Sequence, residues 1–375
     1  MNFPANEMGA PQPGDPMFTL TEIESPNGGE PRTLRFDNAE IQPLDFATLQ
    51  GARLHQRLTI PLVCRGRTIV GTRIEGQQPG KIVNISTSLE SRFTSEAIGL
   101  VKGGWLPSAL AATHQNTTIL LDRNVVSKIV SHFENGRRRD RPVPDFIDLF
   151  ADQPIRINPL LSVLEGNDRR IPTPGEAAAQ LEEVERKLRA ALPQAELAIG
   201  PDSLRGALGL IEDSRASFER KQHFLHHIAP RMVSPVARRD VEACWNDIVL
   251  SADRYGVSRR SLVVLAALSA AAVPNGKSPA KNLLKFRRGY SEGDAYNALA
   301  DLRALELFIG CHCLLPDEPM QLCTADKPMA LLWTGIQASN FRWIESGFSY
   351  DMTPVEGLFP ESVGLSWQSI LYEEN

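Results

Sequence analysis

Four acidic residues stand where a folded chain could gather them for metal-dependent chemistry. They are Asp122, Glu165, Asp301 and Asp326. Carboxylates held close together repel one another and raise each other's pKa unless a cation neutralises them. Hard divalent cations such as Mg²⁺ or Mn²⁺ bind carboxylate oxygens together with water and phosphate oxygens. Such a centre polarises a phosphodiester and lowers the pKa of a bound water, which is the chemistry of phosphodiester hydrolysis.

Two of these acids come just after short apolar segments that we predict to be buried strands. Asp122 directly follows Thr118–Leu121, and Asp326 stands two residues after Gln321–Thr324. A short apolar run between turn or helix signals is typical of a buried strand. Ligands of open α/β folds bind at the carboxyl ends of parallel strands, which meet at one edge of the sheet. We therefore expect Asp122 and Asp326 to be neighbours.

The other two acids are expected in helices. Glu165 directly follows Pro159–Leu164, which we predict to be a short helix. Asp301 lies within a helix that we predict from about Asp294 to Ile309. Asp294, at the start of that helix, is the alternative to Asp301 as third acid. Only the tertiary fold could bring these widely spaced positions to the two strand ends.

Each acid also has a purely structural interpretation. Asp122 could serve only as the N-cap of the helix that follows it, and Asp326 could belong to an ordinary turn. Glu165 could be a solvated helix end. A carboxylate inside an apolar helix, as at Asp301, needs a partner, and we expect the nearby Arg303 to face elsewhere.

The two segments in which an aspartate follows a predicted strand resemble motifs of the PIN-domain nucleases. Ile119–Asn124 is similar to the first strand and acidic motif of that family, and Leu322–Lys327 is similar to its late Thr-x-Asp motif. The resemblance covers four short motifs within Thr117–Trp333. It implies a parallel sheet flanked by helices, one or two Mg²⁺ or Mn²⁺ ions, and the roles that follow. Catalytic and metal-binding roles fall to Asp122, Glu165, Asp301 and Asp326, with Asn124, Thr324 and the alternative acid Asp294 in support.

The chain departs from the family pattern in its spacing. The stretch between Glu165 and Asp301 is longer than in compact PIN toxins, and the stretch from Asp301 to Asp326 is wider than expected. We therefore predict an enlarged, helix-rich α/β domain over 116–375, with a helical insertion at about 174–290. The apolar strands do not alternate with polar residues, which favours a parallel sheet between helices.

The region ahead of this domain has a different texture. Residues 1–16 are rich in Pro, Gly and Asn and are expected to be disordered. Residues 17–115 are β-rich, with a hairpin predicted from Leu58–Val63 and Thr68–Ile74 around Cys64–Arg67. Gly103–Asn116 is a plausible junction. The sequence leaves open whether this region is a separate module or an extension of the main domain.

Two basic stretches are candidates for nucleic-acid contact. One is a run of arginines in a predicted loop, and the other lies beside Phe286 and Tyr290, which could stack on bases. For the arginine run, a solvated loop is the favoured interpretation. The candidates are Arg137, Arg138, Arg139, Lys285, Arg287 and Arg288. The Cys311-His312-Cys313 run has no second cysteine pair to complete a zinc site, so buried cysteines are the favoured interpretation.

Composition sets the remaining expectations. A net charge of −5 argues against a broad basic surface, although a local basic groove is compatible with it. The N-terminus lacks the pattern of a secretory signal, and the apolar run Leu262–Val273 is too short to span a bilayer. Five cysteines, an odd number without disulfide-framework spacing, favour a reduced cytoplasmic setting without a membrane.

These observations together predict a metal-dependent endonuclease. By analogy with the family, we expect RNA as substrate and a toxin or defence role. The alternatives are a non-catalytic PIN-like scaffold that binds a partner, and a structure-specific DNA nuclease. A protein partner or a homo-oligomer is compatible with each of them.

Overall fold

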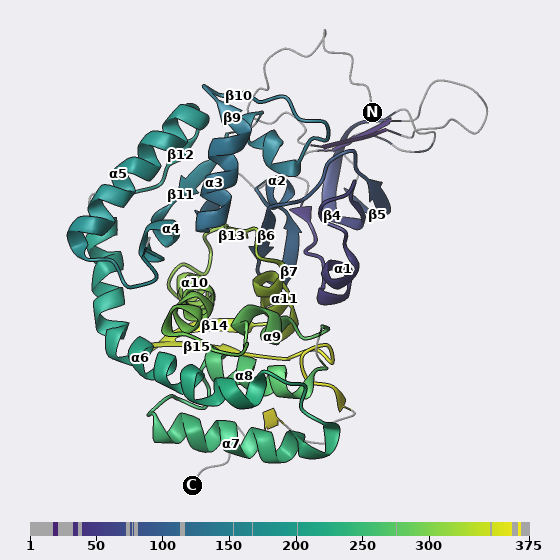
Figure 1. The fold of residues 1–375 in the computed structure, drawn as a ribbon. Helices are drawn as coiled ribbons and strands as arrows, with labels where there is room; N and C mark the ends of the chain where they lie inside the picture. Colours follow the sequence, from purple (N-terminus) through teal and green to yellow (C-terminus); the bar gives the residue numbers. More distant parts are fainter. Residues whose placement is uncertain are drawn as a thin grey trace.

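The computed structural model places a six-stranded mixed sheet at the centre of the chain (Figure 1). The structure describes residues 18–21, 33–36, 40–72, 76, 78, 82–112, 117–152, 154–166, 168–200, 202–274, 276–345, 347–361 and 367–368. Residues 1–16, which we expected to be disordered, lie outside the described residues.

The central sheet has the strand order β12-β11-β8-β13-β6-β7. Its first four strands are parallel to one another, and β6 and β7 add an antiparallel edge. The bounds are β6 Ile98–Val101, β7 Gly104–Pro107, β8 Thr118–Leu121, β11 Arg156–Asn158, β12 Glu196–Leu197 and β13 Met320–Thr324. Every residue of β13 is buried, as is expected for a strand that helices cover on both faces.

The chain reverses direction across this sheet next to β8. From β8 it passes through β11 to β12 on one side, and it later returns to β13 on the other side of β8. The carboxyl ends of β8 and β13 therefore flank a topological switch point, the place where open α/β sheets bind ligands. Both strands end in the predicted acidic motifs.

Helices pack on both the sheet and one another. Helix α3 contacts β13 and α4 contacts β8, whereas α2 and α11 both contact β6. The first group of helices has the bounds α1 Phe46–Gly51, α2 Ser108–Ala111, α3 Arg123–His132, α4 Leu160–Leu164 and α5 Pro174–Ala191. The second group is α6 Ser203–Met232, α7 Val241–Arg254, α8 Leu262–Ala272, α9 Pro279–Leu284, α10 Glu292–Leu314 and α11 Lys327–Ile336. Short 3₁₀ helices cover Phe146–Ala151 (η1) and Arg238–Asp240 (η2).

The helical half of the molecule lies beyond the carboxyl ends of the parallel strands. Helices α6, α8 and α9 contact α10 there, and α7 packs on α6 and α8 (Figure 1). Helices α5 and α6 run along one flank. Every residue of α8 is buried, which accounts for its Ala- and Leu-rich sequence. No helix in the described part of the chain has both the length and the apolar character needed to cross a membrane.

The N-terminal β region differs from the predicted hairpin. A single long strand, β4 (Thr59–Thr72), replaces the two expected strands and pairs with β5 (Ile82–Glu90). The register shifts between Cys64 and Arg67, so the turn signal there corresponds to an irregularity within one strand rather than to a chain reversal. The other strands of this sheet are β1 Phe18–Thr21, β2 Thr33–Phe36 and β3 Glu40–Ile41.

Two expected boundaries also need correction. The main sheet begins at β6, ahead of the expected boundary near residue 116, because the β6–β7 hairpin hydrogen-bonds to β13. The insertion expected at 174–290 is not wholly helical, because β12 extends the sheet beside β11. Two-residue strands such as β12 are too short to leave a periodic pattern in the sequence.

The Asn135-Gly136 pair forms a turn shortly after the end of α3 at His132. It lies between β9 (Phe133–Glu134) and β10 (Arg137–Arg138), which pair antiparallel. Both residues have positive φ, 50° and 74°, as a tight hairpin turn requires. A second hairpin, of β14 (Ser339–Ile344) and β15 (Gly347–Asp351), packs on α10.

Candidate functional site

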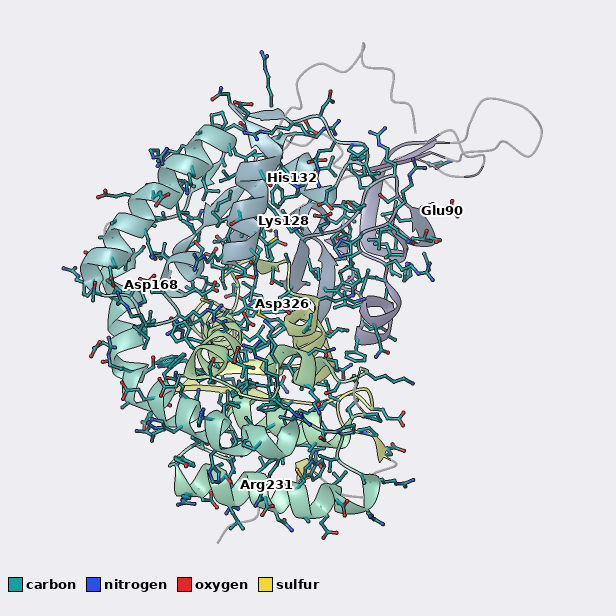
Figure 2. All side chains as sticks on the ribbon, viewed as in Figure 1. Glu90, Lys128, His132, Asp168, Arg231 and Asp326 are labelled. Carbon is teal, nitrogen blue, oxygen red and sulfur yellow. The ribbon has the colours of Figure 1, made fainter. Side chains whose placement is uncertain are left out.

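The two strand-end aspartates are linked through one threonine. The hydroxyl of Thr324 donates a hydrogen bond of 2.7 Å to Oδ2 of Asp122. The same hydroxyl oxygen accepts a bond of 3.0 Å from the backbone N–H of Asp326. The β13 end is therefore attached to the β8 end at the switch point, with Asp326 near the centre of the molecule (Figure 2).

The side chains of these two aspartates have different local roles. The Asp326 carboxylate caps α11 by accepting a bond of 2.9 Å from the Met329 N–H. The Asp122 side chain makes no capping bond to α3, although it stands at the N-cap position and is only 7% exposed. The capping interpretation therefore describes Asp326 and not Asp122.

Glu165 is the C-cap of α4, the residue directly after Leu164, and three contacts hold that end of the helix in place. The Tyr296 hydroxyl donates to the Glu165 carbonyl at 2.7 Å, and Arg303 Nη2 donates to the Leu164 carbonyl at 2.8 Å. Arg123 donates to the carbonyl of Gly166. A Cβ on Gly166 would approach the Arg170 carbonyl to 2.6 Å, and φ is +74°, so this chain reversal requires glycine.

A small cleft between α4 and α10 brings three of the predicted acids together. We call it the acidic cleft; its volume is about 20 Å³, enough for one water-sized group. The residues around it are Asp122, Leu161, Leu164, Glu165, Ala300, Asp301, Arg303, Ala304 and Leu307. Leu161, Ala304 and Leu307 are only half-buried, so the cleft reaches the surface.

The carboxyl groups of the cleft are electrostatically coupled. Burial, together with the charge on Asp122, raises the pKa of Glu165 to about 7. Burial also raises the pKa of Asp301 well above its ordinary value, with further contributions from Asp326 and Asp122. The pKa of Asp122 is raised by burial, which outweighs its hydrogen bond from Thr324. Asp326 thus acts on both Asp122 and Asp301, although it does not line the cleft.

Arg303 lies in the acidic cleft, contrary to the expectation that it faces elsewhere. Its side chain is 7% exposed and lines the cleft with Asp301 and Glu165. Residues two apart on a helix do not share a face, so the sequence spacing concealed this contact. The long side chain reaches the cleft, with its guanidinium held by Leu164 and packed over the Phe218 ring at 5.0 Å. No pattern in the sequence would have identified it.

Asp294, the alternative third acid, has a structural role at the start of α10. It forms a capping box with Ser291 and accepts hydrogen bonds from Arg287 at 2.8 and 3.0 Å. It stands seven residues before Asp301, about 10 Å along the helix axis. Asp301 is the acid of this helix that lines the cleft.

The predicted basic residues divide into two groups. Lys285 is exposed, and its charge lowers the pKa of both Glu165 and Asp301, so it stands near the cleft. Arg287 is paired with Asp294, and Arg288 is exposed. Arg137, Arg138 and Arg139 lie beyond the C-terminal end of α3, whereas Asp122 precedes its N-terminus. The helix separates the arginine run from the cleft by about 15 Å.

The supporting residue Asn124 lies exposed in the first turn of α3, where its side chain hydrogen-bonds Asp122 and lowers the pKa of that carboxyl. The Cys-His-Cys run is separate from the cleft. His312 is buried against the rings of Phe308, Trp333 and Phe341, and burial lowers its pKa to about 3.

The oxygen donors of the cleft fit a hard divalent cation in chemical type. The pKa values of these three carboxyl groups are raised, chiefly by burial, and a divalent cation would favour their ionised forms. Their present positions do not form a closed ligand set: among the described residues, no group of three or more His, Cys, Asp or Glu could hold a metal ion as placed. Asp122, Glu165 and Asp301 are the residues that would hold an ion here, with Asp326 beside them.

Comparisons with known proteins add no assignment. No protein-family model, curated protein or solved structure matches the chain.

Proposed function

We propose that the protein is a metal-dependent endonuclease with a PIN-like arrangement of acids, acting on RNA. The observation that carries the proposal is that Asp122, Glu165 and Asp301, from three separate elements, line one cleft beside Asp326. The cleft lies at the switch point of the sheet, next to the carboxyl ends of β8 and β13. Structural acids are normally paired with cations or hydrogen-bond donors. A cluster of carboxyl groups whose like charges repel one another therefore favours a ligand-binding role.

The side chains divide the work of such a reaction. The Thr324 hydroxyl donates to Oδ2 of Asp122 and so orients this carboxyl group at the end of β8. Glu165 and Asp301 supply further oxygen donors from the two walls of the cleft. A bound Mg²⁺ or Mn²⁺ would polarise a phosphodiester and lower the pKa of an attacking water. Its charge would also favour the ionised form of the acids.

RNA is the favoured substrate by analogy with the PIN-like nucleases, as is a toxin or defence role. Lys285 stands exposed near the cleft and is suited to a backbone phosphate of an incoming strand. A structure-specific DNA nuclease would use the same acids, so substrate preference must be measured. A scaffold without catalytic activity would leave the acids without a ligand.

The proposal is tested by replacing the strand-end acids one at a time. Asp122→Asn and Asp326→Asn should each lower Mn²⁺-dependent cleavage of single-stranded RNA at least about 100-fold, as for loss of several kcal/mol. Asp247→Asn on α7, which removes an exposed carboxylate paired with Arg231, is the matched control and should retain activity. Circular dichroism and thermal unfolding would verify that each variant is folded. Full activity in either strand-end variant would refute the site assignment.

The same variants separate the enzyme from its rivals. Mn²⁺ should raise the melting temperature of the wild-type protein and of Asp247→Asn, but less that of Asp122→Asn. Matched RNA and DNA strands of the same sequence would establish which nucleic acid is cut. A protein that neither gains stability with Mn²⁺ nor cuts either strand would be a scaffold.

A further inference from the structure

The acidic cleft contains one cationic group whose hydrogen-bonding capacity is incompletely used. Arg303 is more than nine-tenths buried, and its Nη1 has no hydrogen-bond partner among the described residues. A buried donor without a partner costs roughly 1–3 kcal/mol. Such groups in a folded protein usually contact a ligand or an ordered water. The free donor therefore points to something that the cleft takes up.

The guanidinium is held in place through its other contacts. Nη2 donates to the Leu164 carbonyl at 2.8 Å, and the Phe218 ring lies 5.0 Å from Cζ. These contacts fix the plane of the group, which leaves Nη1 as a rigid donor. Arg303 also lies close enough to Glu165 to lower the pKa of that carboxyl, although it makes no ion pair with it within 4 Å. The Arg303 guanidinium is therefore not tied up in an ion pair with Glu165.

The size of the cleft restricts what Nη1 can meet. A volume of about 20 Å³ admits one water molecule or one oxygen of a larger group, and excludes a base or a sugar. Guanidinium groups are suited to phosphate oxygens, to which they donate charge-assisted hydrogen bonds. A phosphate oxygen is also the group that a nuclease must hold beside its acids.

We propose that Arg303 is the phosphate-binding residue of the acidic cleft, with Nη1 donating to a non-bridging oxygen of the substrate phosphodiester. The inference rests on the proposed function and adds to it a substrate contact. The bound oxygen places the phosphate beside Asp122, Glu165 and Asp301.

The test measures binding of inorganic phosphate and of Mg²⁺ separately, by calorimetry on the full chain. Arg303→Met should weaken phosphate binding in Mg²⁺ buffer about tenfold, the effect of one charge-assisted hydrogen bond. The affinity for Mg²⁺ alone should stay the same or rise, because a positive charge has left the acidic cleft. Arg303→Lys should fall between the two, because it keeps the charge and loses the forked geometry.

Arg231→Met is the matched control, since it removes an arginine from the far, helical end of the molecule (Figure 2). Its ion pair with Asp247 is exposed and contributes little to stability. Phosphate binding in this variant should equal that of the wild type. Thermal unfolding of all four proteins would show whether Arg303→Met is folded, and Arg303→Lys provides the same test if it is not.

The outcomes separate this inference from the nuclease proposal. Equal phosphate affinity in the wild type, Arg303→Met and Arg303→Lys would overturn the inference, as would a wild type that binds no phosphate. A parallel loss of Mg²⁺ and phosphate affinity would overturn it too, since that is the result of a merely structural arginine. RNA cleavage by the wild type is measured independently. Arg303-dependent phosphate binding without cleavage would retain the inference and reject the nuclease.

Discussion

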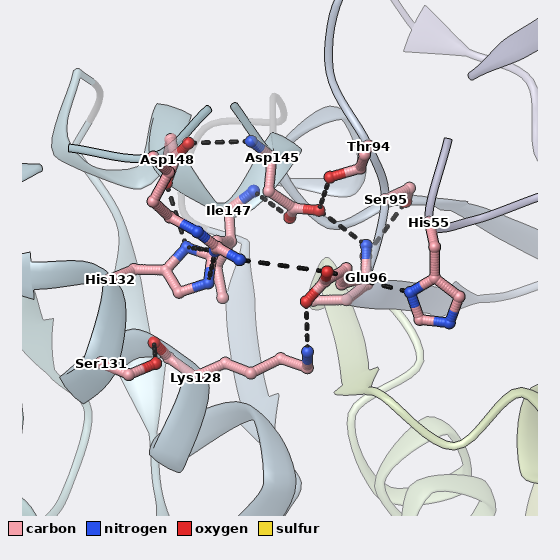
Figure 3. Close-up of polar contacts among 12 residues, drawn as sticks. His55, Thr94, Ser95, Glu96, Lys128, Ser131, His132, Asp145, Ile147 and Asp148 are labelled. Atoms are coloured by element: carbon pink, nitrogen blue, oxygen red, sulfur yellow. Dashed lines mark hydrogen bonds and ion pairs between the residues drawn. The ribbon is translucent and has the colours of Figure 1, made fainter. Parts of the chain in front are cut away.

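Two clusters of buried acids in this protein differ in what surrounds them. One is the acidic cleft. The other, which we call the polar network, joins α3, η1 and the segment before β6, and includes Glu96, Lys128, His132, Arg141, Asp145 and Asp148 (Figure 3). Both contain carboxyl groups that the fold shields, wholly or in part, from bulk water. Only in the polar network does every carboxyl group accept a hydrogen bond from another group of the protein.

The polar network is satisfied internally. Asp145 accepts hydrogen bonds from the Thr94 hydroxyl and from the Glu96 and Ile147 N–H groups, at 2.6 to 3.0 Å. Asp148 accepts one of 3.0 Å from His132 and another from the Asp145 N–H. Burial alone would raise the pKa of Asp148, but the His132 contact and the backbone bond hold it below its ordinary value.

The acidic cleft is not satisfied in this way. Among the described residues, no hydrogen-bond donor contacts the carboxyl group of Glu165 or Asp301, and the pKa of both is raised. Burial acts on both clusters, so burial by itself does not distinguish a structural acid from a functional one. The presence or absence of internal donors does, because a buried charge without donors requires an external ligand.

The largest expected effect is on the polar network. Asp148→Ala should lower the free energy of unfolding by about 3 kcal/mol, because it leaves buried His132 and the Asp145 N–H without an acceptor. Urea unfolding at pH 7 measures this loss. Cleavage per folded molecule should stay within about twofold of the wild type, since the network lies outside the cleft. If Asp148→Ala kept its stability but lost cleavage activity, the polar network would not be the purely structural cluster that we describe.

The acidic cleft should respond in the opposite direction. Asp301→Asn should raise the free energy of unfolding at pH 8 by about 1–2 kcal/mol, because it removes a buried charge that repels its neighbours. The same variant should lose metal-dependent cleavage. Urea unfolding and an RNA cleavage assay provide the two measurements. Destabilisation comparable to that of Asp148→Ala would mean that Asp301 has a structural partner.

A third expected effect is a change in how the free energy of unfolding depends on pH. The folded state raises the pKa of Glu165 from 4.5 to about 7, so it favours the protonated form. The resulting stability is fully present below pH 4.5 and is lost as the pH rises through 7. Glu165→Gln cannot ionise, so its stability relative to the wild type should increase by about 2 kcal/mol between about pH 5 and pH 7. Parallel stability curves for the two proteins, from chemical unfolding without metal, would contradict the raised pKa.

The positions of many strands and helices could be predicted from the sequence. The segments predicted around Thr118–Leu121 and Gln321–Thr324 are strands β8 and β13, and the long amphipathic stretches are helices. These predictions succeed because strand and helix periodicities are local properties. The α/β fold class is confirmed in its coarse form, a mixed sheet between helices. The PIN-like identity stays a proposal.

The expectations that failed depend on partners distant in sequence. The chain runs straight through Cys64–Arg67 because β5 pairs along β4 on both sides of that point. The short strand β12 exists because it hydrogen-bonds to β11, about 40 residues earlier. Arg303 enters the cleft because the end of α4 accepts its hydrogen bond. None of these partners can be inferred from the local pattern.

The sequence by itself determined that two aspartates end apolar strands, at Asp122 and Asp326. This followed from residue type and spacing, since a buried parallel strand delivers its last residues to one edge of the sheet. Only the tertiary structure decided that Glu165 and Asp301 line a cleft with Asp122, and that Asp294 does not. It also decided that Arg303 belongs there. The physical reason is that hydrogen bonds from Tyr296 and Arg303 hold the end of α4 beside α10, which sets which helical side chains share the cleft. Contacts so far apart in sequence leave no periodic signal.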